Sequence, residues 1–156
     1  MLKKQYSEAE IWLKITRWCD YQDRSQQEVR DKLYTFGLHK QQVELLISQL
    51  VTEGFINEER FAMSFARGKF RMLQWGRVKI RLALQQKKIS EYCIKKALAA
   101  LPEEDYRATI AKLFQKKLKT ARGDNPRQQQ YAAAQYVISR GFEPALVQEC
   151  ANLDEE

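Results

Sequence analysis

The chain has 156 residues, of which 44% are hydrophobic and 30% charged, with only six glycines and three prolines. This composition supports a folded core and excludes a disordered linker and a turn-rich β protein. No run reaches the roughly 18 consecutive apolar residues of a membrane span. Residues 1–14 carry charges where a signal peptide would need its apolar centre, so no signal peptide is expected.

The three cysteines argue against an extracellular or metal-binding protein. Cys19, Cys93 and Cys150 lie far apart in the sequence, are odd in number and form no CxxC pair. A disulfide framework and a zinc finger are therefore not expected. We predict a cytoplasmic protein without a metal or other cofactor.

The formal net charge of +7 is concentrated in the middle of the chain. Residues 57–101 carry eleven basic and three acidic side chains, whereas residues 1–56 carry eight of each and residues 102–156 carry eight and nine. A concentrated positive field attracts a polyanion or an acidic protein surface. The alternative is an ordinary solvated face of a helical protein.

Helical periodicity dominates the first third of the sequence. Apolar residues at helical spacing predict an amphipathic helix over 8–19. Next, Ser25 and Glu28 have the spacing of a capping box, in which the hydroxyl accepts from the Glu28 amide and the carboxylate binds back to the cap. They predict the start of a second helix, and a third follows over 40–53. Glycines stand where these two helices are expected to end: Gly37 and Gly54.

This pattern occurs three times. Shifts of 51 and then 53 residues superimpose the apolar positions of the second and third predicted helices on later ones: Val29, Ile80 and Ala133; Leu33, Leu84 and Val137; Leu38, Ile89 and Phe142; Val43, Ile94 and Val147. A shift of 50 residues relates the first helices, placing Ile11 on Phe61. The fold class predicted is all-α, with three tandem three-helix repeats in an elongated, curved array. The predicted domains cover 1–56, 57–101 and 102–156.

Residues at the predicted helix ends agree with these units. Asn57 is a suitable N-cap for an acid-rich first turn, and another acid-rich turn follows Pro102. Pro126 and Pro144 stand at first helical positions, where the missing N–H is harmless. The segment 120–126 is the most polar connection and is predicted to be a flexible loop.

The sequence lacks the groups that carry catalysis. His39 is the single histidine, and it precedes a predicted helix, where a surface or capping role is expected. No Gly-rich phosphate loop, HExxH or GxSxG motif occurs. We therefore predict that the protein is not an enzyme.

Basic residues on predicted helix surfaces are the candidate contact residues for a partner. They fall mainly in the second unit, with three more on one face of a helix in the third: Arg60, Arg67, Lys69, Arg71, Arg77, Lys79, Arg81, Lys87, Lys88, Lys112, Lys116 and Lys119. Phe70 and Trp75 lie among them. Aromatic and basic side chains together suit base stacking with phosphate contact, or a protein interface. The alternative, that both aromatics close the core of the unit, is slightly favoured.

Three segments resemble the RecX family of regulatory proteins. Residues 21–33 are similar to its RS-x-x-E-L-x-x-K-L signature, and residues 54–62 to its G-[YF]-[IL]-[ND]-[DE]-x-R-[FY]-A junction. Arg67 and the stretch 76–89 follow a third pattern of the family. Lys88 departs from that pattern, because the family usually has glycine there, so the resemblance leaves the geometry of this turn open.

The resemblance implies a partner and a role. RecX proteins are small all-α proteins of three-helix repeats that lie in the groove of the RecA–DNA filament and restrain strand exchange and ATP hydrolysis. Many of them also bind DNA. The resemblance therefore implies DNA repair, homologous recombination and the SOS response as the context, with RecA filaments and single- or double-stranded DNA as partners.

Three hypotheses follow from the sequence. The first is a regulator of RecA filaments, which uses Arg67, Lys69, Arg71, Arg77, Lys79 and Arg81 for electrostatic contacts. The second is a stand-alone helical DNA-binding module that acts through its basic middle unit. The third is a helical scaffold that binds another acidic protein. No heptad pattern is long enough to signal an oligomer, so we expect a monomer that does not contact membranes.

Overall fold

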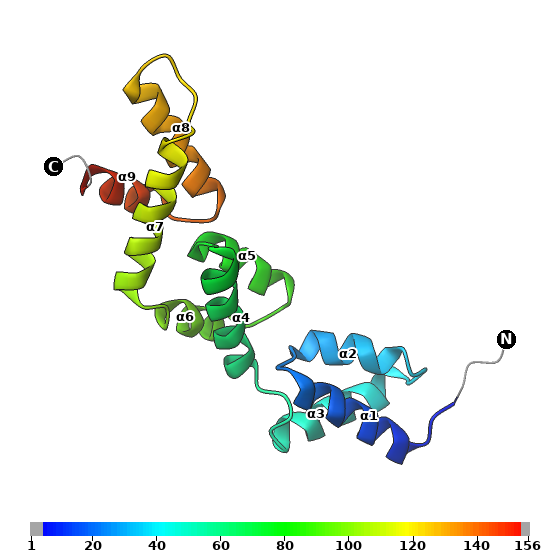
Figure 1. Ribbon diagram of the computed structural model, residues 1–156. Helices are drawn as coiled ribbons and strands as arrows, with labels where there is room; N and C mark the ends of the chain where they lie inside the picture. The colour runs from blue at the N-terminus through cyan, green and yellow to red at the C-terminus, as the bar shows by residue number, and fades with distance from the viewer. Residues whose placement is uncertain (1–4, 154–156) are drawn as a thin grey trace.

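The structure, a computed structural model, describes residues 5–153. Expectations for residues 1–4 and for the last residues of the third unit, 154–156, lie outside the described residues. Within 5–153 the chain forms nine α-helices and no strand. They follow one another in an elongated, curved array with α1–α3 at one end and α7–α9 at the other (Figure 1). This arrangement confirms the predicted all-α array of three-helix repeats. No helix in the described part of the chain is long and apolar enough to span a bilayer.

Repeat 1 contains α1 (Glu8–Tyr21), α2 (Gln26–Tyr34) and α3 (Lys40–Thr52). Its first helix begins with a complete capping box. Ser7 Oγ accepts from the Glu10 backbone N–H at 3.1 Å, and the Glu10 carboxylate accepts from the Ser7 N–H at 3.4 Å. Acidic side chains in the first turn also complement the helix dipole.

Only half of the predicted capping box at α2 forms. Ser25 is fully buried, and its Oγ accepts from the Glu28 backbone N–H at 3.1 Å, as predicted. The prediction that the Glu28 carboxylate binds back to the cap is wrong, since that carboxylate accepts from Lys87 Nζ at 2.9 Å in the next repeat. A charged donor gives a carboxylate a stronger hydrogen bond than a neutral amide does, and this donor becomes available only when the repeats come together.

Repeat 2 contains α4 (Glu58–Leu73), α5 (Arg77–Gln86) and α6 (Glu91–Ala99). The predicted N-cap is confirmed, because Asn57 Oδ1 accepts from the Arg60 backbone N–H at 2.9 Å. α4 is two residues longer than α1, and Phe70 near its C-terminal end contacts Tyr106 of the third repeat.

Repeat 3 contains α7 (Glu103–Leu118), α8 (Pro126–Ser139) and α9 (Pro144–Leu153). Both prolines occupy the predicted first helical positions, where no intrahelical N–H is needed. The polar segment predicted as a loop connects α7 to α8.

Equivalent turns in the three repeats have the same unusual backbone. Gly37, Lys88 and Gly141 end the second-helix turn of their repeats with φ of 83°, 61° and 100°. They are related by the shifts of 51 and 53 residues that the apolar pattern indicates. Lys88 therefore keeps the left-handed turn of the repeat even though it is not a glycine.

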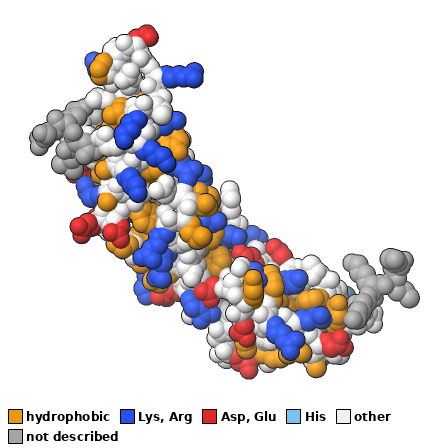
Figure 2. Space-filling view, viewed as in Figure 1, with side chains coloured by type: hydrophobic (Ala, Val, Ile, Leu, Met, Phe, Trp, Pro, Cys, Tyr) orange, Lys and Arg blue, Asp and Glu red, His pale blue; other side chains and the backbone are white. Residues whose placement is uncertain are grey.

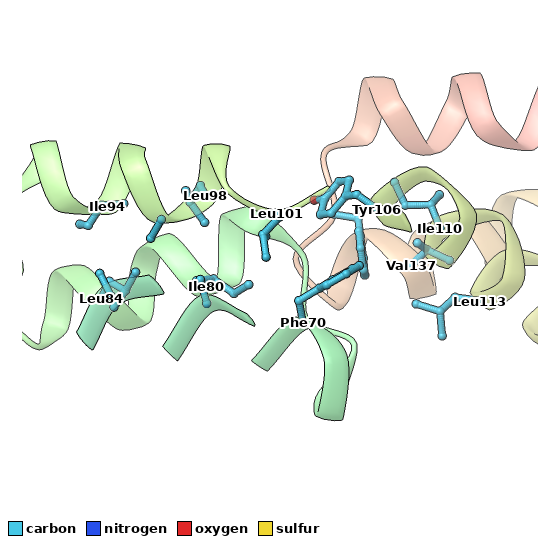
Figure 3. Packing of buried hydrophobic residues seen from close by; sticks show 14 of the residues in the cluster. Phe70, Ile80, Leu84, Ile94, Leu98, Leu101, Tyr106, Ile110, Leu113 and Val137 are labelled. Atoms are coloured by element: carbon cyan, nitrogen blue, oxygen red, sulfur yellow. The ribbon is translucent and has the colours of Figure 1, made fainter. Parts of the chain in front are cut away.

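The buried apolar residues form two separate clusters. One belongs to repeat 1 and lies within residues 11–56, whereas the other runs without interruption through repeats 2 and 3, from Phe61 to Cys150. Where repeats 2 and 3 meet, the ring of Tyr106 lies 5.7 Å from that of Phe70 (Figure 3). It also lies 5.2 Å from the ring of Phe142. Repeats 2 and 3 thus share one core, and repeat 1 has its own.

The aromatic residues among the basic candidates belong largely to this core. Phe70 is 5% exposed, and the partly buried Trp75 packs against the cluster. The preferred interpretation, that they close the core, is confirmed for Phe70. Trp75 contributes to the core but keeps part of its surface.

Candidate functional site

The candidate site is the set of basic residues on repeats 2 and 3, and carboxylates of neighbouring helices neutralise part of it. On the face in Figure 2, Lys and Arg side chains are spread along the length of the array, with Asp and Glu beside some of them. The described contacts show which of these cations bind carboxylates of this chain and which are available to an external anion.

Two cations of repeat 2 bind carboxylates of repeat 1. Arg60 Nε lies 2.7 Å from Asp23 Oδ1, and Lys87 Nζ lies 2.9 Å from Glu28 Oε1. Ser64 Oγ also donates to Asp23 Oδ2 at 3.3 Å. Because the two repeats have separate apolar clusters, these polar bonds connect them directly. Arg60 and Lys87 are therefore charge-compensated.

Arg77 binds repeat 3 in the same way but at a less exposed position. Its guanidinium pairs with Glu103 and lies 2.9 Å from Glu143 Oε2, and its side chain is 23% exposed. The guanidinium carbon stacks 3.8 Å from the centre of the Tyr106 ring, and the Arg77 backbone N–H donates to Tyr106 Oη at 3.0 Å. Arg77 is thus part of the joint between repeats 2 and 3.

Tyr106 is the buried centre of this joint. It is fully buried, and its hydroxyl donates to the Glu143 carboxylate. Burial raises the pKa of Tyr106 well above its usual range, so the hydroxyl stays protonated and able to donate.

The backbones of repeats 2 and 3 also meet here. The Gly76 N–H donates to the Arg140 carbonyl, and the Val78 N–H to the Gly141 carbonyl, each at 2.9 Å. A Cβ on Gly76 would lie 2.2 Å from the carbonyl carbon of Gly141, so only glycine allows this approach.

Arg81 is compensated within its own repeat, because it pairs with Glu91. Together with Arg77 it borders a hollow of about 410 Å³ that also contains Glu103 and Glu143. The two carboxylates oppose the field of the two guanidinium groups, which makes this hollow a poor anion site.

Arg67 and Arg71 lie one turn apart on α4 and are exposed. No ion pair joins either of them to a carboxylate within residues 5–153. Arg67 also borders, with Arg60, a hollow of about 410 Å³ on the surface of repeat 2. These two arginines are available to an external anion.

Lys69 and Lys79 flank the half-buried Trp75. Their Nζ atoms lie 5.1 and 4.7 Å from the indole ring, within the range of cation–π attraction. Two cations lie over a partly exposed aromatic ring, so this position combines positive charge for a phosphate with an aromatic surface. We refer to Lys69, Trp75 and Lys79 as the tryptophan site.

The remaining candidates are exposed and carry no ion pair in the described part of the chain. Lys88 lies on the left-handed turn after α5. Three lysines follow i, i+4, i+7 spacing, two of them in α7 and the third at its C-cap. With the two arginines of α4 they make up what we call the unpaired cations: Arg67, Arg71, Lys88, Lys112, Lys116 and Lys119.

The carboxylates that compensate the other cations could not be identified from the sequence. They lie between 10 and 66 residues away along the chain from their partners: Asp23, Glu28, Glu91, Glu103 and Glu143. The acid-rich helix start after Pro102 signalled Glu103 only as a dipole partner, and nothing singled out Glu91. Nothing in the local sequence indicates which cation each carboxylate meets.

The cysteines and the single histidine take structural positions in the described part of the chain. Within residues 5–153 no cluster of three His, Cys, Asp or Glu side chains could hold a metal ion. All three cysteines are buried thiols, and burial raises the pKa of Cys19 to about 11, which suppresses its nucleophilic form. His39 takes the N-cap position of α3, where its backbone N–H donates to Gln42 Oε1 at 2.9 Å.

Comparison with known protein families identifies the second repeat. Residues 57–98 match the family model described as RecX, second three-helix domain. These residues cover α4, α5 and nearly all of α6.

Curated relatives match most of the chain. The Regulatory protein RecX of Bacillus mycoides (strain KBAB4) is 24% identical over 139 residues, which are 89% of this chain and 52% of that protein. The Regulatory protein RecX of Prosthecochloris aestuarii (strain DSM 271 / SK 413) is 27% identical over 133 residues, 85% of this chain and 84% of that protein. Like the Bacillus mycoides protein, several relatives are longer, and the chain spans about half their length.

Solved structures share the fold. The crystal structure of RecX from Lactobacillus salivarius superimposes with a TM-score of 0.85 at 22% identity, over 92% of this chain and 94% of that one. A second crystal structure of regulatory protein RecX gives a TM-score of 0.80 at 22% identity, over 97% of this chain and 81% of that one.

Proposed function

Since the chain belongs to the RecX family of regulatory proteins, we propose that it binds RecA recombinase filaments on DNA and modulates them. The expected effect is mostly inhibition of recombinase, ATPase and strand-exchange activity. The partner and this effect come from the family resemblance, and the fold and charge distribution support them.

The observation that carries the proposal is the set of unpaired cations. Ion pairs occupy Arg60, Arg77, Arg81 and Lys87. The pairs of Arg60, Arg77 and Lys87 join neighbouring repeats, and that of Arg81 lies within repeat 2. The unpaired cations are exposed and lie on repeats 2 and 3 of the elongated array. Exposed cations distributed over two repeats suit a long anionic partner such as a nucleoprotein filament. We therefore assign the partner contacts to this subset of the predicted residues.

A charge reversal tests this assignment. Arg67→Glu/Arg71→Glu changes the local charge by four units without breaking any ion pair in the described part of the chain. The measurement is DNA-dependent ATP hydrolysis by RecA at substoichiometric ratios of this protein. We expect the wild type to inhibit the hydrolysis, and the variant to require about a tenfold higher concentration for the same inhibition.

The matched control is Arg17→Glu/Lys40→Glu, which makes the same charge change on exposed positions of repeat 1. It is expected to inhibit as the wild type does. A wild type without effect on RecA would contradict the proposed function. Equal inhibition by both double variants would remove Arg67 and Arg71 from the mechanism.

The tryptophan site favours a second candidate function, a stand-alone DNA-binding module. Lys69 and Lys79 beside a partly exposed Trp75 offer phosphate contact and stacking without a second protein. This function requires tight binding to DNA alone, with an affinity that falls steeply with salt. Binding of the wild type to DNA without RecA, measured from 50 to 200 mM salt, separates the two functions. Weak binding with a flat salt slope would exclude the second function.

A further inference from the structure

Repeat 1 has an open apolar groove between α1 and α3. The groove has a volume of about 440 Å³ and is lined by Glu8, Ala9, Ile11, Trp12, Leu38, Gln42, Leu45, Leu46 and Gln49. Leu45 at its edge is 71% exposed, and Glu8 is the one charged residue of the lining. The proposed function makes no use of this surface.

The same seam is closed in repeat 2. There α4 and α6, the counterparts of α1 and α3, pack closely along their length. Lys96 Nζ lies 2.7 Å from Glu59 Oε1 and bridges the two helices at the surface. The repeat shifts of 51 and 50 residues place Leu45 at the position of Lys96 and Ala9 at that of Glu59. Repeat 1 thus has two apolar residues where repeat 2 has an ion pair.

Repeat 3 closes its seam in a similar way. Arg107 Nη1 lies 3.5 Å from Glu149 Oε2, which connects α7 with α9. The shift of 53 residues relates Glu149 to Lys96, and hence to Leu45. Aligning the helix starts relates Arg107 to Trp12, another residue of the groove.

Side-chain size explains why the seam of repeat 1 stays open. The tight packing of repeat 2 uses two buried alanines, Ala62 and Ala97, which allow close helix approach. Their counterparts in repeat 1 are Trp12 and Leu46, both only partly buried. The first repeat therefore exposes an apolar surface at the position where its two sister repeats carry a charged bridge. The groove therefore offers apolar contacts that the corresponding seams of the other two repeats do not.

We propose that this groove binds an amphipathic helix of a partner protein, with aliphatic side chains in the groove and a basic residue facing Glu8. An apolar groove between two helices is the usual receptor for such a helix. Residues 1–56 carry equal numbers of basic and acidic side chains, so repeat 1 has no field that would attract a polyanion. The single charge of the lining is negative, which selects a basic neighbour on the incoming helix.

The test transplants the bridge of repeat 2 into repeat 1. Ala9→Glu/Leu45→Lys places an ion pair across the groove, leaves the net charge unchanged and alters no buried residue. The probe is a 14-residue model helix of leucine and lysine with all leucines on one face. Binding is followed by NMR at the Trp12 indole N–H and the Leu45 methyl groups of the wild type, and at Trp12 in the variant.

In the wild type we expect the NMR signals of the Trp12 indole N–H and the Leu45 methyl groups to shift until the groove is saturated with the model helix. In the variant the affinity for the model helix should fall about tenfold or more, because one apolar side chain of the helix no longer fits the groove. Leu13→Gln is the matched control, because Leu13 is 49% exposed on the same helix but does not line the groove. It should bind as the wild type does. A peptide of the same composition with its leucines distributed around the helix should not bind.

Three results would overturn the proposal. The first is a model helix that leaves Trp12 and Leu45 of the wild type unshifted. The second is equal affinity for the wild type and Ala9→Glu/Leu45→Lys. The third is concentration-dependent dimerisation of the wild type that the transplant abolishes, which would assign the groove to a second copy of this chain.

Discussion

Lys88 adopts the left-handed backbone of the repeat although a non-glycine residue disfavours that conformation. Gly37 and Gly141 take the same left-handed turn, and glycine does so without steric cost. A lysine there has its Cβ close to the following carbonyl, which costs about 1–2 kcal/mol. The rest of the repeat, including the buried Leu84 and Ile89 on either side, holds the turn in place.

Lys88→Gly is therefore expected to stabilise the protein. Removing the backbone strain stabilises the folded state by more than the added conformational freedom of glycine stabilises the unfolded chain. The free energy of unfolding should therefore rise by about 0.5–1 kcal/mol. Urea denaturation followed by circular dichroism measures it. The control Lys87→Gly should destabilise, because residue 87 has a negative φ and its side chain binds Glu28. A lower urea midpoint for Lys88→Gly would contradict this account.

Arg77 shows what spacing within one helix leaves open. The sequence predicts it as a contact candidate because it is a basic residue on a predicted helix surface of the second unit. The structure pairs Arg77 with two carboxylates of repeat 3 and stacks it on Tyr106. Spacing within one helix identifies which residues share a face, but it does not identify what that face meets.

Helix ends were the most predictable elements. Asn57, Pro126 and Pro144 start helices where the sequence indicated, because caps and first-turn prolines act within four residues. The capping box of α2 was half wrong for the complementary reason, since Glu28 finds a cation in another repeat. Local signals thus determine helix ends, and long-range charges can redirect a side chain.

The buried cap of α2 gives a prediction at this scale. Ser25→Ala removes the acceptor of the Glu28 N–H in a fully buried position, and we expect a loss of about 1–2 kcal/mol in the free energy of unfolding. Thermal or urea denaturation measures the loss. Ser48→Ala, at an exposed position within α3, is the control and should change stability by less than about 0.5 kcal/mol. Equal effects of the two substitutions would show that the cap is unimportant.

At the scale of the whole molecule the two joints between repeats differ. Repeats 2 and 3 share an apolar core, backbone hydrogen bonds and a partly buried arginine. Repeats 1 and 2 have separate cores and are bridged by the pairs Asp23–Arg60 and Glu28–Lys87. Partly exposed ion pairs are screened by salt, whereas apolar burial is not.

The orientation of repeat 1 should therefore depend on ionic strength. At 50 mM salt we expect NMR relaxation to give one rotational correlation time for α1–α3 and α4–α9. At 1 M salt, where the Debye length is about 3 Å, α1–α3 should tumble more independently. Asp23→Asn/Glu28→Gln should show the high-salt behaviour already at 50 mM, because it removes both cross-repeat charges.

The joint between repeats 2 and 3 serves as the internal control. The helices α4–α9 should tumble as one unit at both salt concentrations, because their shared core does not depend on charge. A double variant indistinguishable from the wild type at 50 mM would mean that the two ion pairs do not fix repeat 1.

The sequence by itself determined the helices, their ends and the threefold repeat, down to the shifts that relate Gly37, Lys88 and Gly141. These features depend on interactions within a few residues and on the period of the apolar positions, both of which can be read along the chain. Only the tertiary structure decided which cations are neutralised, because carboxylates such as Glu143 reach Arg77 from 66 residues away. It also showed that repeat 1 exposes an apolar groove, since whether a seam closes depends on how two helices approach each other.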